Sequence, residues 1–259
     1  MIRKSGTLVG LFLGVFSIFG AFFLEGGSVK ALFIISSLII VFGGTFAAVI
    51  IGFGLDKIKE IFTLIGLAYF PRNFDVIKIV DVFVDLAIKS RNEGLLSIEK
   101  DLNKFSHYFP KKMVKFVMDG TDPDSIYNLA QLELKAMQDR HYSNIFIFTK
   151  MGGYAPTMGI IGTVMGLIMT LANAGADPNS LIKNIATAFI ATLWGVFSAN
   201  IIWLPIGDRL KKCHLEEKSL MEISLEGVLT LQSGEIPSVM KARLLGMLPQ
   251  KVQLKKLNP

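Results

Sequence analysis

The side chains that most often carry out chemistry in proteins are few in this chain, and they are not grouped. There is one cysteine, Cys213, and the three histidines, His107, His141 and His214, are scattered without the spacing of a metal site. No nucleophile and base, metal-ligand set or phosphate-binding loop can be assembled. The sequence therefore argues against an enzyme, and we expect no bound cofactor or metal.

Two apolar stretches combine small residues with hydroxyl groups at helical spacing. They carry Gly159, Gly162, Thr163 and Gly166 in the first, and Thr192 and Gly195 in the second. Small residues three and four positions apart let helix backbones approach closely, and hydroxyls can hydrogen-bond across such a contact. The pattern predicts that these two helices pack together as an inner pair. On the pattern alone, helix packing is a simpler explanation than any special chemistry.

Both stretches belong to a set of four runs that contain no charged residue, namely 5–24, 31–55, 151–176 and 184–207. A helix of about twenty apolar residues, rising 1.5 Å per residue, crosses a hydrocarbon core of roughly 30 Å. The sequence therefore predicts an all-α, polytopic membrane protein with four transmembrane helices.

The segment 56–150 is too charged to lie in lipid, since it holds 14 of the 27 Lys and Arg and 13 of the 21 Asp and Glu. Its apolar residues recur every three or four positions from Ile77 to Ile88, and Asp122-Pro123 is a typical helix start. We expect a first transmembrane helix pair (1–55), a helical cytoplasmic domain (56–150), an inner transmembrane pair (151–207) and a cytoplasmic C-terminal helix and tail (208–259).

The basic residues predict the orientation. Arg3 and Lys4 precede the first run, 9 basic residues follow the fourth, and on the other side only Lys30 and Lys183 occur. The positive-inside rule then places both termini and the central domain in the cytoplasm. The net charge of +6 follows from this orientation and from contact with anionic lipid, so nucleic acid is not an expected partner.

The four apolar runs also lack Asp, Glu, His and Lys. Ion pumps and proton-coupled transporters place Asp, Glu, His or Lys within the membrane, because a translocated ion needs an exchangeable group. No such residue occurs in these runs. If this protein helps to conduct an ion, the titrating group must come from a partner chain.

Several motifs resemble a known family. Residues 151–166 read MGGYAPTMGIIGTVMG and residues 191–205 read ATLWGVFSANIIWLP, and this pair resembles the inner helices of the MotA/TolQ/ExbB family. Residues 90–99 (SRNEGLLSIE), 119–122 (DGTD) and 227–234 (GVLTLQSG) resemble segments of its MotA and PomA branch, the flagellar motor stator subunits. The ExbB and TolQ branch resembles the inner pair alone and typically has three spans. An ExbB/TolQ-type energy transducer that drives a periplasmic partner protein is therefore the alternative, followed by a passive scaffold or a self-contained transporter.

The resemblance implies an assembly in the bacterial inner membrane. Similar proteins form a homopentamer around two copies of a single-span partner, MotB or PomB, whose helix supplies an aspartate. The cytoplasmic domain would push on the rotor protein FliG, so that ion flow becomes flagellar rotation. Threonine at both inner hydroxyl positions occurs in sodium-driven and in some proton-driven relatives, so the coupling ion is H+ or Na+.

The resemblance also implies roles for single residues. The rotor-facing pair is Arg91 and Glu99, the coupling prolines are Pro156 and Pro205, and the ion-path hydroxyls are Thr163 and Thr192. Each role has a simpler alternative. The charged pair could be an ordinary solvated helix face, the threonines could bond back to the carbonyl four residues earlier, and the prolines could mark the ends of spans.

Overall fold

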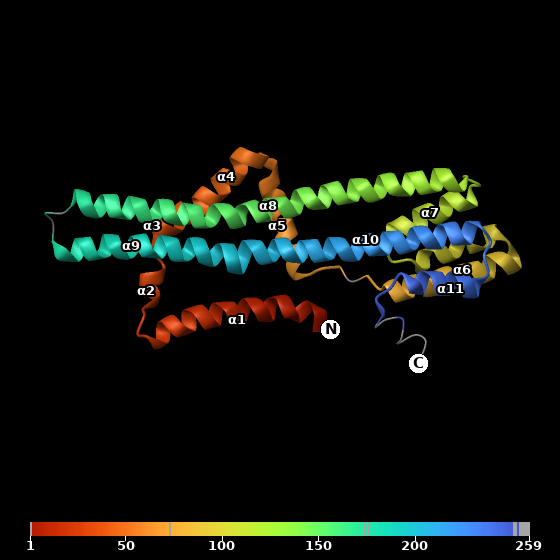
Figure 1. The fold of residues 1–259 in the computed structure, drawn as a ribbon, viewed down its shortest axis with the longest axis horizontal. Coiled ribbons are helices and arrows are strands. Elements are labelled where there is room, and N and C mark those ends of the chain that lie inside the picture. The colour runs from red at the N-terminus through yellow and green to blue at the C-terminus, as the bar shows by residue number, and fades with distance from the viewer. Residues whose placement is uncertain (1, 73, 174, 176, 251–252, 254–259) are drawn as a thin grey trace. The chain divides into compact units, whose positions relative to one another are not determined.

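A computed structural model describes residues 2–72, 74–173, 175, 177–250 and 253, and no β-strand occurs within them (Figure 1). These residues form two compact units. The apolar unit is Met1–Pro71 with His141–Cys213, and the charged unit is Arg72–Arg140 with His214–Pro259. Four helices of the described chain are long and apolar enough to cross a membrane. The predicted all-α class with four spans is confirmed.

Helical segments of different lengths precede the long helix α8 in the apolar unit. They are α1 (Ile2–Leu24), α2 (Val29–Leu32), α3 (Ile35–Leu38), the π-helical turn η1 (Ile39–Gly43), α4 (Gly44–Phe53) and α5 (Asp56–Tyr69). The long helices are α8 (Pro123–Ala172) and α10 (Leu204–Gln232), and between them lie α9 (Pro178–Phe197) and the π-helical turn η3 (Ser198–Trp203). Both α8 and α10 continue into the charged unit.

The two units divide the chain differently from the expected domains. Of the segment 56–150, residues 56–71 and 141–150 belong to the apolar unit. Helix α8 continues through 150 and 151 although Gly152, Gly153 and Pro156 follow directly. Membrane helices tolerate such residues where neighbouring helices satisfy the freed backbone groups. Ala174 and Ala176 at the expected end of the third run lie outside the described residues, as do 251–252 and 254–259 of the expected tail.

The second apolar run is not the single helix that its composition suggests. Phe33 and Ile34 lie outside helical geometry between α2 and α3, so the span begins at Ile35. Nε1 of Trp194 donates a hydrogen bond to the carbonyl oxygen of Leu32 over 2.8 Å. A carbonyl freed by a helix break needs such a partner in an apolar environment. The break is thus stabilised by a residue far away in the sequence.

The charged unit is built from short helices with polar caps. They are α6 (Val76–Glu93), the 3-10 helix η2 (Leu95–Lys104), α7 (Tyr108–Met118), α11 (Pro237–Gly246) and parts of α8 and α10. The carboxylate of Asp75 accepts the N–H of Lys78 at the start of α6, and Asp122 accepts the N–H of Ser125 over 2.9 Å at the start of α8. The predicted helix start at Asp122-Pro123 is confirmed.

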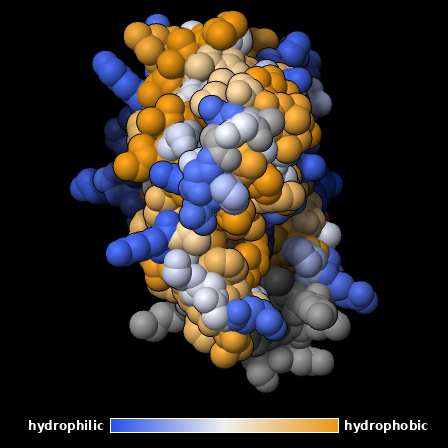
Figure 2. Space-filling model, turned by 90° about the vertical axis from the view of Figure 1, so that its left-hand side faces the viewer, coloured by the Kyte–Doolittle hydropathy of each residue, from blue (hydrophilic) through white to orange (hydrophobic). Residues whose placement is uncertain are grey.

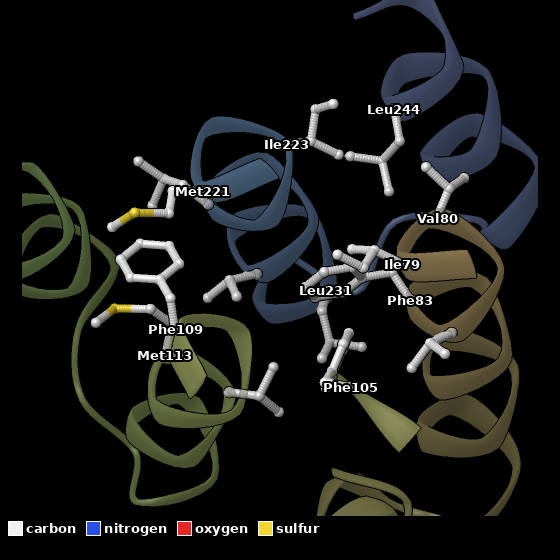
Figure 3. Close-up of a cluster of buried hydrophobic side chains, with 14 of the residues drawn as sticks. Ile79, Val80, Phe83, Phe105, Phe109, Met113, Met221, Ile223, Leu231 and Leu244 are labelled. Carbon is white, nitrogen blue, oxygen red and sulfur yellow. The ribbon is translucent and has the colours of Figure 1, made fainter. Parts of the chain in front are cut away.

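One hydrophobic core holds these helices together. Figure 3 shows Phe83 of α6, Phe109 and Met113 of α7, and Met221 of α10 pointing into a common interior. All four are fully buried. Complete burial of such side chains stabilises a fold by about 1.5–3 kcal/mol each. This core fixes η2, which lies between α6 and α7 in the chain and contributes Ile98, Leu102 and the neighbouring Phe105 to it.

Candidate functional site

Two glycines bring the backbones of α8 and α9 into direct contact. A Cβ atom added to Gly195 would lie 2.7 Å from the carbonyl oxygen of Ala155 and 3.1 Å from Cα of Gly159. A Cβ atom added to Gly159 would lie 2.9 Å from the carbonyl oxygen of Ala191. Side-chain carbons do not approach backbone atoms this closely, so glycine alone fits at either position.

The contact continues along both helices through Gly162 and Gly166. A Cβ atom on Gly162 would lie 2.5 Å from Cβ of Ala191, and one on Gly166 would lie 2.6 Å from Cβ of Ala188. The four glycines that the sequence singles out for packing therefore lie at one continuous interface. Small side chains on both helices make this approach possible.

Thr163 of α8 and Thr192 of α9 meet at the same interface, where their hydroxyl groups hydrogen-bond to each other. Both also reach the carbonyl oxygen of Gly159, Thr163 over 3.1 Å and Thr192 over 3.4 Å. The Thr163 hydroxyl lies four residues from this acceptor, so the simple back-bonding geometry is present together with the cross-helix contact. Each hydroxyl has one proton and two acceptor sites. The pair therefore keeps lone pairs that could accept from water or bind a cation.

Both prolines occupy the long inner helices. Pro156 lies inside α8, and Pro205 is the second residue of α10, directly after the π-helical turn η3. Neither has an N–H group, so each leaves a backbone carbonyl of the preceding turn without its usual donor. Helices α8 and α10 are in contact close to these prolines, as a Cβ atom on Gly152 would overlap the Leu204 side chain.

Arg91 and Glu99 lie on either side of a chain reversal in the charged unit. Helix α6 ends at Glu93, Gly94 has a φ of +85° that favours glycine, and η2 begins at Leu95. Both charged side chains are exposed. Within the described part of the chain, neither takes part in an ion pair. Their charges are therefore available to another molecule.

An ion-pair clamp holds this reversal in place. Nζ of Lys89 lies 2.7 Å from Oδ2 of Asp101, and Nζ of Lys104 lies 3.0 Å from Oδ1 of the same carboxylate. Hydrogen bonds from these lysines lower the pKa of Asp101, and the hydrogen bond with Asp101 raises the pKa of Lys89. The clamp joins α6 to η2, because Lys89 lies two residues before Arg91 and Asp101 lies two residues after Glu99. Sequence reasoning missed it; a glycine at the end of the amphipathic pattern was the one available signal that the chain turns here.

Comparison with known proteins agrees with this architecture. A sequence profile described as the MotA/TolQ/ExbB proton channel family matches residues 101–223, and one described as motility protein A N-terminal matches residues 8–94. Motility protein A of Bacillus subtilis is 33% identical over 250 residues, which cover 96% of this chain and 92% of that protein. The chain belongs to the MotA/TolQ/ExbB proton channel family.

Further similarities identify the motility branch of the family. Motility protein A of Treponema pallidum is 36% identical over 248 residues, which cover 95% of each chain. The solved structure of the flagellar MotAB stator complex from Bacillus subtilis contains a chain with 34% identity and a TM-score of 0.89, with 96% of this chain and 98% of that one covered. The protein is thus an ion-channel subunit of the flagellar stator and not an enzyme. The ExbB/TolQ alternative is not favoured.

We predict that Gly195→Ala weakens the α8–α9 contact. The new methyl group would meet backbone atoms of α8, which cannot rotate away as a side chain can, and overpacking of this kind costs about 1–3 kcal/mol. The purified complex should lose its assembly at a lower temperature, measured by size-exclusion chromatography after heating. Gly153→Ala in α8 is the control, since no atom lies within 4 Å of its new Cβ. Equal stability of the two variants would contradict the proposed contact.

We predict that Asp101→Asn loosens the segment between Arg91 and Glu99. Because the pKa of Asp101 is lowered in the folded state, its contribution is present above the usual value of 3.8 and is lost as the pH falls through the lowered pKa. Hydrogen exchange of residues 90–104 should therefore be faster in the variant than in the wild type near neutral pH. The two rates should converge in acid, below the pKa of Asp101. A difference that is independent of pH would show that the carboxylate charge does not stabilise the reversal.

Proposed function

We propose that this stator subunit forms its ion channel with a single-span partner of the MotB or PomB type, and that the partner supplies the titrating carboxylate. The observation that carries the proposal is the absence of any charged residue from the runs 151–176 and 184–207, which contain the closely packed inner helices. The hydroxyls of Thr163 and Thr192 would border the ion path. A hydroxyl can replace water around Na+ or join a hydrated proton path, so the coupling ion is either Na+ or H+.

The exposed apolar surface supports assembly in the membrane. Large side chains of α1, α8 and α9 lie open to the surroundings, for example Phe16, Leu171 and Phe189, which are 80%, 76% and 67% exposed. Figure 2 likewise shows hydrophobic side chains across much of the face it presents. Surfaces of this kind require lipid or other chains to cover them. In our proposal five copies surround two partner chains in the inner membrane, with the termini and the charged unit in the cytoplasm.

Torque would pass to the rotor protein FliG through the charged unit. Arg91 and Glu99 are suited to this contact because both are exposed on a reversal that the Lys89–Asp101 pair holds in place. Exposed charges of both signs contribute orientation and fast association more than affinity. Such a contact can form and break repeatedly while the rotor turns.

Exchange of the two charges, Arg91→Glu with Glu99→Lys, should reduce stall torque while membrane insertion and assembly remain intact. The exchange keeps the net charge but reverses the local field that the rotor meets. Torque is measured with beads attached to flagella, at a fixed ion-motive force. Compensating reversals on FliG should restore part of it.

A matched control is Lys78→Glu with Asp139→Lys, an exchange between two other exposed residues of the charged unit. Wild-type torque is expected for this variant. If the Arg91/Glu99 exchange also gave wild-type torque, the proposed rotor contact would be wrong.

The isolated protein in liposomes should conduct neither protons nor sodium, whereas its complex with the partner should conduct once activated. A charge crossing 100 mV releases about 2.3 kcal/mol, which is useful only if a group in its path changes state. Thr192→Ala in the complex should lower the flux or change its ion preference without dissociating the ring. If the isolated protein conducted ions as fast as the complex, the proposal that the partner supplies the essential carboxylate would be wrong.

A further inference from the structure

A basic groove lies beside Glu99 in the charged unit. Its lining includes Lys100 of η2 together with Lys111, Lys112 and Lys115 of α7, and its volume is about 710 Å³. Lys111 and Lys115 are one helical turn apart, so they project from the same side of α7. Four ammonium groups from two elements therefore converge next to a residue of the proposed rotor contact.

Three of these four lysines have no ion-pair partner among the described residues. Lys112 forms an ion pair with Glu133. Lys100, Lys111 and Lys115 form none with any described residue. Like charges held in one groove repel each other, and a carboxylate placed among them would convert repulsion into attraction.

We propose that this groove binds an acidic segment of the rotor protein. The proposal rests on the proposed stator function and extends its contact surface from Glu99 along α7. In this arrangement carboxylates of the rotor lie against Lys100, Lys111 and Lys115, and a basic residue of the rotor lies against Glu99. Continuity with Glu99, which itself lines the groove, joins the two contacts into one surface.

The composition of the groove favours a protein segment over a small anion or a lipid headgroup. Glu99 at its edge would repel a phosphate, whereas a protein surface can present acidic and basic groups at matching positions. Tyr108 is 54% exposed and lines the groove, and aromatic residues are enriched in protein interfaces. Burial, reinforced by the charges of Glu133 and Glu217, raises the pKa of Tyr108. Like other tyrosine hydroxyls, that of Tyr108 is protonated at neutral pH, and it can donate to a carboxylate.

The test compares two variants of equal net charge in the intact stator complex. The groove variant is Lys100→Gln, Lys111→Gln and Lys115→Gln, which leaves the Lys112–Glu133 pair intact. The control is Lys78→Gln, Lys135→Gln and Lys241→Gln, three exposed lysines of the same unit that form no ion pair with described residues. Binding of each complex in lipid nanodiscs to purified rotor protein is measured as a function of NaCl concentration.

The groove variant should bind the rotor protein roughly tenfold more weakly than the wild type, and its binding should depend less on salt. The control should stay close to the wild type. Poly-L-glutamate should compete with the rotor protein for the wild-type complex and should lose this effect on the groove variant. Equal affinity of the groove and control variants would overturn the proposal. So would lysine-dependent binding of inorganic phosphate or of phosphatidylglycerol vesicles without any loss of rotor binding.

Failure of this proposal can be told apart from failure of the stator function. If the wild-type complex drives rotation and responds to the Arg91 and Glu99 exchange, while the groove variant matches its control, the groove proposal alone is wrong. If the wild-type complex neither binds the rotor protein nor restores rotation to cells that lack a stator, the proposed function fails and the groove proposal fails with it.

Discussion

The backbone contact between α8 and α9 at Gly159 and Gly195 is the constraint on which the apolar unit depends. Within a bilayer, lipid tails are as apolar as leucine, so burial alone gives two helices no reason to associate. Close packing and hydrogen bonds must hold them together, and both require backbones that approach to contact distance. The bond between the hydroxyls of Thr163 and Thr192 follows from this approach. Trp194, on the same helix as Gly195, then holds the break in the second span through the Leu32 carbonyl.

The same contact explains how a channel subunit can dispense with charge. A pair of helices in backbone contact leaves no room for a buried carboxylate with its hydration, and these runs carry none. The polar groups at this contact are the hydroxyls of Thr163 and Thr192. Two of the three points where the chain passes between the units lie inside helices, in α8 and α10. The chain therefore passes from one unit to the other without a loop at these two points.

Much of this architecture could be predicted from the sequence, because the decisive patterns are local. Charge-free runs, the amphipathic period of α6 and the Asp122-Pro123 start each depend on neighbours within a few residues. The break at Phe33 and Ile34 could not be predicted in this way. It depends on Trp194, whose indole lies 162 residues from the Leu32 carbonyl in sequence. The π-helical turn η1 likewise lies in an apolar stretch, whereas η3 does have a local signal, because Pro205 follows it and cannot donate a backbone hydrogen bond.

The charged surface, too, could be predicted from the sequence only in part. Resemblance singled out Arg91 and Glu99, yet their eight-residue spacing says nothing about whether the two side chains are free. That depends on which of the surrounding charges are already paired. Asp101 is held by Lys89 and Lys104, and Glu133 is held by Lys112, so the remaining lysines of η2 and α7 stay unbalanced. Charge counts alone cannot reveal such a difference. A lysine can bind another molecule when the carboxylates near it already pair with other lysines. Which lysines are left in this state depends on how α6, η2, α7 and α8 pack together in the folded protein.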